Sequence, residues 1–285
     1  MASTRRSFLR TAGLGTVGAA LLAGGRGIFA GLPRGGRQAA PEKIPFDLGM
    51  ASYTFRAFGL DEAVAMTKRL DLKKIALKSM HLPLETPDAE IAKLAAKVRA
   101  SGLDLYGGGV IYMTTKDEVR RAFDYAKAAG MSVIIGVPNH ELLDMAEIMV
   151  RQTGIALAIH NHGPGDKVYP TPDSVAERIA HRDRRIGLCL DVGHTQRSGI
   201  DPADVALRYA GRLLDVHVKD VSAATAAGTT VEIGRGVVDI PAFLRALIKI
   251  GYRGAVSLEY EKDEKDPFPG ASESVAFLRK ALAAL

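Results

Sequence analysis

Apolar segments alternate with helix-like segments eight times along this chain from residue 46 onward. Each apolar segment is almost continuously hydrophobic, which is typical of parallel strands that are buried on both faces. Eight strand–helix units within about 240 residues are the number that closes a (β/α)8 barrel. The strands are predicted near 46–55, 74–80, 103–113, 131–137, 155–161, 186–191, 213–218 and 255–260. The helices are predicted near 60–70, 88–101, 116–129, 141–153, 172–181, 202–211, 240–250 and 272–285. No proline- and serine-rich linker divides them, so we predict an α/β fold with a single TIM barrel over residues 41–285.

Four consecutive predicted strands end in residues that bind metals or transfer protons. The segments read IALAIHNH, LCLDVGH, DVHVKD and VSLEYE, and they carry His160, His162, Asp191, His194, His217, Lys219 and Glu259. The C-terminal ends of barrel strands meet at one face of the fold, where active sites of such barrels lie. A buried carboxylate is costly unless it is paired or bound to a metal. The pattern therefore predicts one metal site at the mouth of the barrel.

The strand order and the motifs Asp-x-Gly-His and His-x-Lys-Asp resemble the xylose isomerase-like TIM-barrel superfamily, in particular its sugar phosphate isomerase/epimerase branch. The resemblance covers essentially the whole chain after the first 40 residues. It implies a divalent metal ion (Mn, Mg, Zn or Co) held by the residues that follow strands 5 to 8. In this sequence those positions are His160, Asp191, His217 and Glu259. The family has a glutamate at the position of His160. This chain therefore lacks one of the two glutamates that form the acid/base pair of the family.

Two histidines of the fifth predicted strand are expected to divide ligation and catalysis between them. Side chains alternate along a strand, so His160 and His162 face the same side. We expect His160 to bind the metal and His162 to act as the general base, because imidazole titrates near neutral pH. The alternative is that one of them only hydrogen-bonds loop backbone. Glu259 and Lys219 are further catalytic candidates, and Lys219 either neutralises an enolate or pairs with a neighbouring carboxylate.

Five other residues are candidates for binding the substrate. Lys78 and His81 follow the second strand, although both are equally compatible with a surface position. Glu141 follows the fourth strand and either supplies the missing carboxylate or favours the start of a helix through the helix dipole. His194 either contacts substrate or supports the neighbouring aspartate ligand. Arg197 follows the Asp-x-Gly-His motif and is a candidate for binding an anionic or polyol substrate.

Residues 1–40 are predicted to form an export leader. The segment STRRSFL resembles a twin-arginine signal and contains Arg5 and Arg6, and the weakly apolar stretch 11–23 follows it. Arg26 interrupts the apolar run, which is then too short to form a stable membrane-spanning helix. The alternative is a basic tail without order. We expect a periplasmic or secreted protein that uses the twin-arginine route and has no membrane span in its mature part.

The charge distribution argues against a nucleic-acid partner. The formal charge of +6 equals the six arginines of residues 1–40, which contain no acidic residue. The rest of the chain has 38 − 6 = 32 basic and 32 acidic residues and no net charge. An endonuclease IV-like hydrolase would need a basic DNA-binding surface, so the balance disfavours that class. The only cysteine, Cys189, lies in an apolar strand and is expected in the core.

The resemblance and the predicted site imply a metal-dependent isomerase or epimerase that acts on a sugar, keto-sugar or related polyol. Proton abstraction next to a carbonyl gives an enediolate, whose developing charge a divalent cation stabilises. Loss of a leaving group from the β-carbon is the alternative outcome, and the histidine after strand 5 favours such a lyase or dehydratase acting on a keto-sugar or glycoside. A non-catalytic carbohydrate-binding barrel is a further alternative, because the fold alone does not determine function. The oligomeric state is left open, with a homo-oligomer as one alternative.

Overall fold

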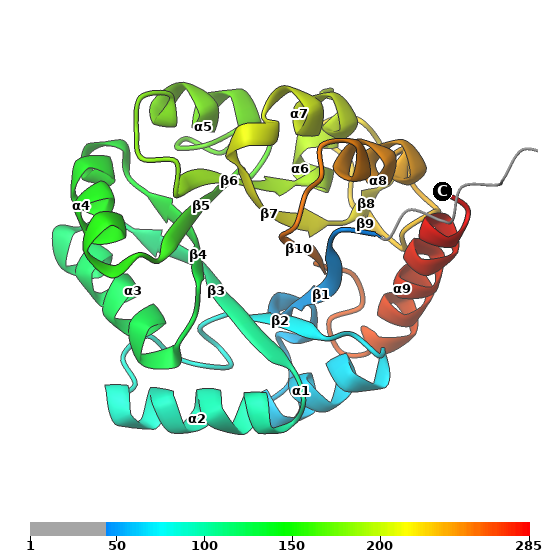
Figure 1. Ribbon diagram of the computed structural model, residues 1–285. Helices are drawn as coiled ribbons and strands as arrows, with labels where there is room; N and C mark the ends of the chain where they lie inside the picture. The colour runs from blue at the N-terminus through cyan, green and yellow to red at the C-terminus, as the bar shows by residue number, and fades with distance from the viewer. Residues whose placement is uncertain (1–43) are drawn as a thin grey trace, which may run out of the picture. The chain divides into compact units, whose positions relative to one another are not determined.

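Eight parallel strands close into a barrel in the computed structural model, which describes residues 44–285 (Figure 1). The barrel strands are β1 (Asp47–Ala51), β2 (Lys74–Leu77), β3 (Asp104–Met113), β4 (Val133–Pro138), β5 (Ala156–His160), β6 (Ile186–Asp191), β7 (Leu213–Val218) and β10 (Ala255–Leu258). The last strand, β10, pairs in parallel with both β7 and β1, which closes the ring. The predicted (β/α)8 fold is therefore confirmed, while the predicted leader lies outside the described residues.

Helices surround the barrel on its outer side (Figure 1). They are α1 (Leu60–Arg69), α2 (Asp88–Ala100), α3 (Lys116–Ala129), α4 (Leu143–Thr153), α5 (Pro172–Ile179), α7 (Pro202–Arg208), α8 (Ile240–Lys249) and α9 (Phe268–Ala283). Local sequence signals define several of their ends. Thr171 accepts a hydrogen bond from the backbone of Ser174 just before the first-turn proline of α5. Gly130 ends α3 at a φ of 63°, a left-handed conformation that favours glycine.

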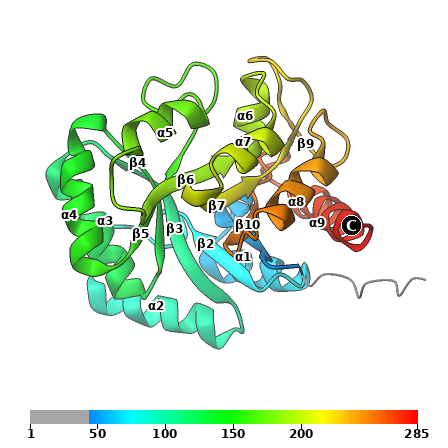
Figure 2. The ribbon, with the colours of Figure 1, turned by 45° about the horizontal axis from the view of Figure 1, so that its top comes forward.

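Three local elements differ from the prediction. The first strand ends at Ala51, and the 3-10 turn η1 (Ser52–Phe55) replaces its predicted second half. A short helix, α6 (Val192–Arg197), follows β6 directly and was not predicted. An antiparallel hairpin of β8 (Asp220–Val221) and β9 (Thr230–Val231) follows β7. Figure 2 shows α6 and this hairpin on the same side of the barrel mouth, and α6 packs against β8.

The barrel strands have few accessible residues, and every residue of β4 and β6 is buried. Polar side chains nevertheless occupy the barrel beneath its mouth. The hydroxyl groups of Tyr106 and Ser257 lie 2.7 Å apart, and the Cys189 thiol donates to the Asp215 carboxylate at 3.3 Å. Cys189 therefore lies in the core, as predicted. The strands below the mouth are thus held together by hydrogen bonds between side chains as well as by apolar packing.

Within residues 44–285, no helix has the length and hydrophobicity that crossing a bilayer requires.

Candidate metal centre

Four side chains converge where β5, β6, β7 and β10 reach the mouth of the barrel. They are His160, Asp191, His217 and Glu259, and each is at most 5% exposed. Candidate ligand atoms, one from each residue, all lie within 4.8 Å of one another. Strand register produces this convergence, because Asp191 of β6 lies beside His217 of β7. Glu259 then follows β10 directly, and its backbone nitrogen donates to the Val218 carbonyl.

The buried ring nitrogens of this group lack partners. Among the described residues, neither nitrogen of His160 or His217 makes a hydrogen bond, although all four atoms are buried. His160 Nε2 lies 3.3 Å from Asp191 Oδ2, and His217 Nδ1 lies 3.2 Å from Glu259 Oε2. Buried polar atoms in folded proteins are normally hydrogen-bonded, so such a cluster requires an explanation. A cation bound between these atoms satisfies them, and His, Asp and Glu are suitable ligands for a divalent metal.

The charges of the site also fit a divalent cation. Lys219 is 2% exposed, and its ammonium lies 3.1 Å from Asp191 Oδ2 and 2.8 Å from Glu259 Oε2. It also pairs with Glu261. Three carboxylates therefore face the Lys219 ammonium, so negative charge is in excess around this group. A cation bound beside them would reduce this excess.

Electrostatics favour the protonation states that metal binding requires for three of the four ligand candidates, His160, Asp191 and Glu259. Burial lowers the pKa of His160 to about 3, against the opposing effect of Asp191, so its imidazole is neutral. Burial raises the pKa of Asp191, but His194 and Lys219 outweigh this effect and hold the pKa below its usual range. The pKa of Glu259 is likewise held well below its usual range, because Lys219 outweighs burial. Neutral imidazoles and ionised carboxylates are the forms that bind metals.

Asp191 also caps a helix with one carboxylate oxygen, and its other oxygen remains available to a metal ion. Its Oδ1 accepts a hydrogen bond of 2.7 Å from the backbone nitrogen of His194 and caps α6. Its Oδ2 faces His160 and Lys219. The Asp-x-Gly-His motif therefore combines a strand end, a candidate ligand and a helix cap in four residues.

His217 has carboxylates on both sides of its ring. Nδ1 faces Glu259, while Nε2 lies 3.7 Å from Oδ2 of the fully buried Asp215. Burial lowers the pKa of His217, but Glu259 and Asp215 outweigh this effect and the pKa is raised. Asp215 is two residues before His217 on β7, so both side chains face the barrel interior.

A second group of three potential ligands, His160, Cys189 and His217, also lies within 4.8 Å. The thiol of Cys189 already donates to Asp215. Burial raises the pKa of Cys189 well above its ordinary value, so the thiolate needed for metal binding is disfavoured. The group that contains Asp191 and Glu259 therefore fits a metal better.

The two histidines of the fifth strand share one cavity, as predicted. Their ring centroids are 4.5 Å apart, and both line an inner cavity of 160 Å³ together with Tyr53, Lys78 and Tyr112. His162 is half-buried, and its Nε2 lies 2.9 Å from the Tyr112 hydroxyl. Burial lowers the pKa of His162, so its imidazole is neutral at neutral pH and able to accept a proton.

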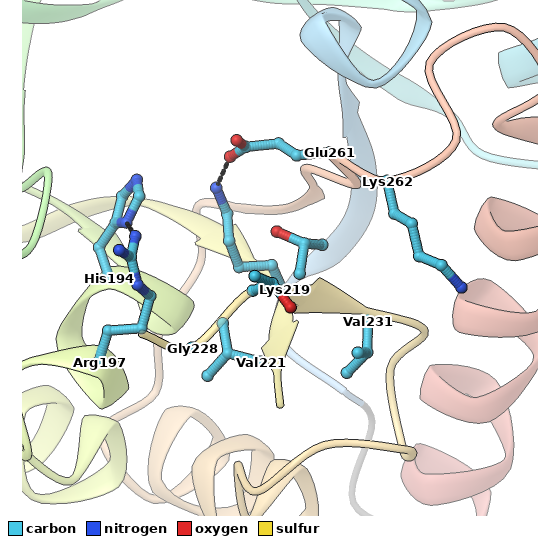
Figure 3. Close-up of a pocket in the computed structure, with 10 residues that line it drawn as sticks. His194, Arg197, Lys219, Val221, Gly228, Val231, Glu261 and Lys262 are labelled. Carbon is cyan, nitrogen blue, oxygen red and sulfur yellow. Dashed lines mark hydrogen bonds and ion pairs between the residues drawn. The ribbon is translucent and has the colours of Figure 1, made fainter. Parts of the chain in front are cut away.

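A larger outer cavity of 530 Å³ adjoins the inner one, and His194 and Glu261 line both (Figure 3). Arg197 lies in the outer cavity, where it contacts His194 Nδ1 at 3.3 Å and donates to the Ala226 carbonyl at 2.9 Å. The predicted substrate-binding positions of His194 and Arg197 are therefore at cavity walls. Lys78 lines the inner cavity, and its ammonium lies 5.1 Å from the ring centroid of Tyr53.

Two predicted substrate contacts lie elsewhere. His81 is buried, and its ring nitrogens lie 2.9 Å from Ser52 Oγ and 3.2 Å from the Phe55 carbonyl oxygen. It therefore anchors η1 and does not line either cavity. Glu141 is exposed before α4 and accepts a hydrogen bond from Asn139 at 3.1 Å. It does not replace the glutamate that is missing after strand 5.

Tyr53, Tyr112, Thr229, Thr230 and Glu261 line the cavities but were not among the predicted site residues. Glu261 was detectable, because it is two residues after Glu259 and thus on the same side of an extended chain. Tyr112 was also detectable as a polar residue near the C-terminal end of a strand. The threonines belong to a hairpin that the sequence pattern does not reveal.

Comparisons with known proteins agree with this fold. The family model of the xylose isomerase-like TIM barrel matches residues 64–281. The rhizopine catabolism protein MocC of Rhizobium meliloti is 33% identical over 146 residues, which cover 46% of this chain and 44% of that protein. Inosose dehydratase of Lacticaseibacillus casei is 26% identical over 145 residues, which cover 45% of this chain and 48% of that enzyme. The matches thus span about half the length of these relatives. The structure of L-ribulose 3-epimerase is similar in fold, with a TM-score of 0.67 at 16% identity over 84% of this chain and 95% of that one.

Proposed function

Because this chain belongs to the xylose isomerase-like TIM barrel family, we propose that it is a metal-dependent enzyme that removes a proton next to a carbonyl group of a sugar, keto-sugar or related polyol. Isomerisation or epimerisation is the outcome proposed first. The observation that carries the proposal is the set of unpartnered ring nitrogens and uncompensated carboxylates beside a half-buried histidine. Proton abstraction requires a group that accepts the proton, which His162 supplies beside the candidate metal ligands, whereas a carbohydrate-binding module does not require one.

The residues of the site divide the reaction between them. His160, Asp191, His217 and Glu259 would hold the cation. When bound, a divalent cation would polarise the carbonyl group and stabilise the negative charge of the enediolate. His162 accepts the proton, because burial keeps its imidazole neutral. Lys219 holds Asp191 and Glu259 in ionised form.

Lys78 and Tyr112 are positioned to bind hydroxyl groups of the substrate. The Lys78 ammonium donates to the Val110 carbonyl at 3.3 Å and lines the inner cavity. The Tyr112 hydroxyl contacts His162 and is part of the same wall. A hydroxyl-rich ligand offers both donors and acceptors to these two groups.

Elimination, as in a dehydratase or lyase, is the second candidate, and a specific pair of residues favours it. Elimination needs one group that accepts the proton and one that donates a proton to the leaving group. His162 and His194 have ring centroids 6.0 Å apart and line the same cavity. The glutamate that the family carries after strand 5 is replaced by His160, and part of the chain is similar to inosose dehydratases.

Incubation of the metal-loaded protein with a panel of sugars and keto-sugars in D₂O tests the proposal. Deuterium incorporation next to a carbonyl, read by NMR, is the expected result for epimerisation and isomerisation, because the carbanion is reprotonated from solvent. A new diastereomer or a ketose–aldose pair identifies these two outcomes, and an unsaturated product identifies elimination, in which the carbanion instead expels its leaving group. Absence of both exchange and an unsaturated product with protein that contains its metal would contradict the proposal. Protein that carries no divalent metal on elemental analysis would instead favour a binding module.

We also propose that the protein is exported by the twin-arginine route, on the basis of Arg5 and Arg6. The double substitution Arg5→Lys and Arg6→Lys should leave the protein in the cytoplasmic fraction. Unchanged recovery of the variant from the periplasm would disprove the assignment.

A further inference from the structure

The inner cavity is smaller than an ordinary ligand site. Its volume is 160 Å³, whereas the outer cavity measures 530 Å³. Ligand sites commonly have volumes of about 300–1,000 Å³. Because His194 and Glu261 line both cavities, a ligand seated beside the candidate metal ligands extends directly into the outer one.

The walls of the outer cavity suit a sugar ring. Val221 and Val231 supply apolar surface (Figure 3). Thr230 adds a hydroxyl group from the same hairpin. A sugar ring presents both C–H surfaces and hydroxyl groups, so this mixture is complementary to it. Ligand sites generally combine apolar walls with a few polar groups that orient the ligand.

The hairpin is held close to the site by tight backbone packing. A side chain at Gly228 would lie 2.2 Å from the Ala223 carbonyl oxygen and 3.2 Å from Cγ of Arg197. Arg197 also donates to the Ala226 carbonyl and contacts His194. The cavity wall is therefore connected through Arg197 to a residue that lines the inner cavity.

The charges of the outer cavity disfavour a phosphate group. Lys219 pairs with three carboxylates, and Lys262 lies 2.8 Å from Glu232. Among the lining residues, Glu261 adds a negative charge, and Arg197 contacts His194 and Ala226 through its two terminal nitrogens, while its buried Nε has no partner among the described residues. Within residues 44–285, Arg197 is thus the one lining cation without a carboxylate partner, and a hydroxyl oxygen is also able to accept from its Nε. Phosphate recognition relies on donors and cations that are available to the ligand. An uncharged, hydroxyl-rich group fits these walls better.

We propose that the outer cavity is a subsite for an uncharged sugar unit that is joined by a glycosidic bond to the unit in the inner cavity. The enzyme then acts on glycosides of at least disaccharide size, in preference to free monosaccharides or sugar phosphates. This inference rests on the proposed function, because the unit in the inner cavity is the one that loses a proton.

Equilibrium binding to the metal-loaded protein tests the subsite without requiring turnover. Cellobiose and maltose, whose reducing units can open to a carbonyl form, are titrated by calorimetry and compared with glucose and glucose 6-phosphate. At least one disaccharide should bind about 10-fold more tightly than glucose, a difference of about 1.4 kcal/mol. Thr230→Trp, which fills the outer cavity, should abolish this advantage. Ile148→Trp on α4 is the matched control, because Ile148 is an exposed hydrophobic residue outside the cavity, and it should retain the advantage.

Two results would overturn the subsite: no disaccharide binds more tightly than glucose, or glucose 6-phosphate binds more tightly than every disaccharide. Titration of these ligands into the unaltered protein distinguishes the outcomes even when Thr230→Trp does not fold. Disaccharide binding without deuterium exchange or an unsaturated product from any sugar would contradict the proposed function alone. Exchange of monosaccharides without a disaccharide preference would contradict the subsite alone.

Discussion

The ammonium of Lys219 lies 2.8 Å from Glu259 Oε2, and both side chains are buried at the mouth of the barrel. The same ammonium lies 3.1 Å from Asp191 Oδ2. Burial lowers the pKa of Lys219, but Asp191 and Glu259 outweigh this effect and raise the pKa well above its ordinary value. Lys219 is thus a fixed cation that shares two carboxylates with the proposed metal ion.

Replacing this lysine should destabilise the metal-free protein and increase its response to metal. Lys219→Met leaves the carboxylates without their ammonium, and removal of one partner of a buried pair costs about 3–5 kcal/mol. Thermal melting with and without Mn²⁺ should show a lower melting temperature without metal and a larger increase when metal is added. Lys262→Met removes an ammonium that is 42% exposed and should change both values little. Equal melting behaviour of Lys219→Met and the unaltered protein would contradict this role.

Loss of a metal ligand should lower the metal content. Asp191→Ala and His217→Ala each remove a side chain whose candidate ligand atom lies within 4.8 Å of the others. Elemental analysis of each purified variant should give well below one equivalent of metal. Glu141→Ala is the control, since Glu141 is exposed and contacts Asn139 instead. If both ligand variants fold by circular dichroism and keep their full metal content, the site is misplaced.

Substitution of the two histidines of the fifth strand should affect metal binding and turnover differently. Neither nitrogen of His160 has a hydrogen-bond partner among the described residues, whereas His162 is half-buried and contacts Tyr112. His160→Ala should weaken metal binding, and excess metal should partly restore turnover. His162→Ala should retain metal but lose about 10²–10⁴-fold in turnover, as expected for a general base, and added metal should not restore it. The opposite pattern would exchange the two roles, and normal behaviour of both variants would remove this strand from the active site.

Asp215 should strengthen metal binding through His217. Its Oδ2 lies 3.7 Å from Nε2 of His217, whose Nδ1 faces Glu259, so Asp215 favours the tautomer that leaves Nδ1 free. Carboxylates in this position typically contribute about 10–100-fold to metal affinity. Asp215→Asn should therefore weaken metal binding by that factor in a chelator competition experiment.

Asp220 provides the control for this experiment. It is also fully buried, but its carboxylate accepts hydrogen bonds from the backbone of Val221, Gly234, Gly236 and Val238. Asp220→Asn should lower the melting temperature and leave metal affinity unchanged. Equal metal affinities of Asp215→Asn and the unaltered protein would show that Asp215 has only a structural role.

The barrel and most of its metal site follow from the order of residues along the chain. Continuous apolar segments define parallel strands, and parallel strands in a closed barrel place their C-terminal ends together. Asp191, His217 and Glu259 each lie within one residue of the end of such a segment, so their convergence did not depend on any loop. His160 and His162 share a side because side chains alternate along an extended chain.

The surroundings of the site were decided by contacts between segments that are distant in sequence. Phe55 is buried in the 3-10 turn η1, and a buried strand would be equally hydrophobic, so hydrophobicity did not distinguish the two elements. His81 contacts the Phe55 carbonyl oxygen of this turn and does not line a cavity. The hairpin that carries Thr230 depends on pairing between β8 and β9. The sequence by itself thus determined the barrel and the residues at its strand ends, because both depend on local periodicity. Tertiary structure decided the hairpin and tyrosine walls of the cavities and selected Asp191, Glu259 and Glu261 as partners of Lys219, because those depend on loops and side chains packed across the mouth.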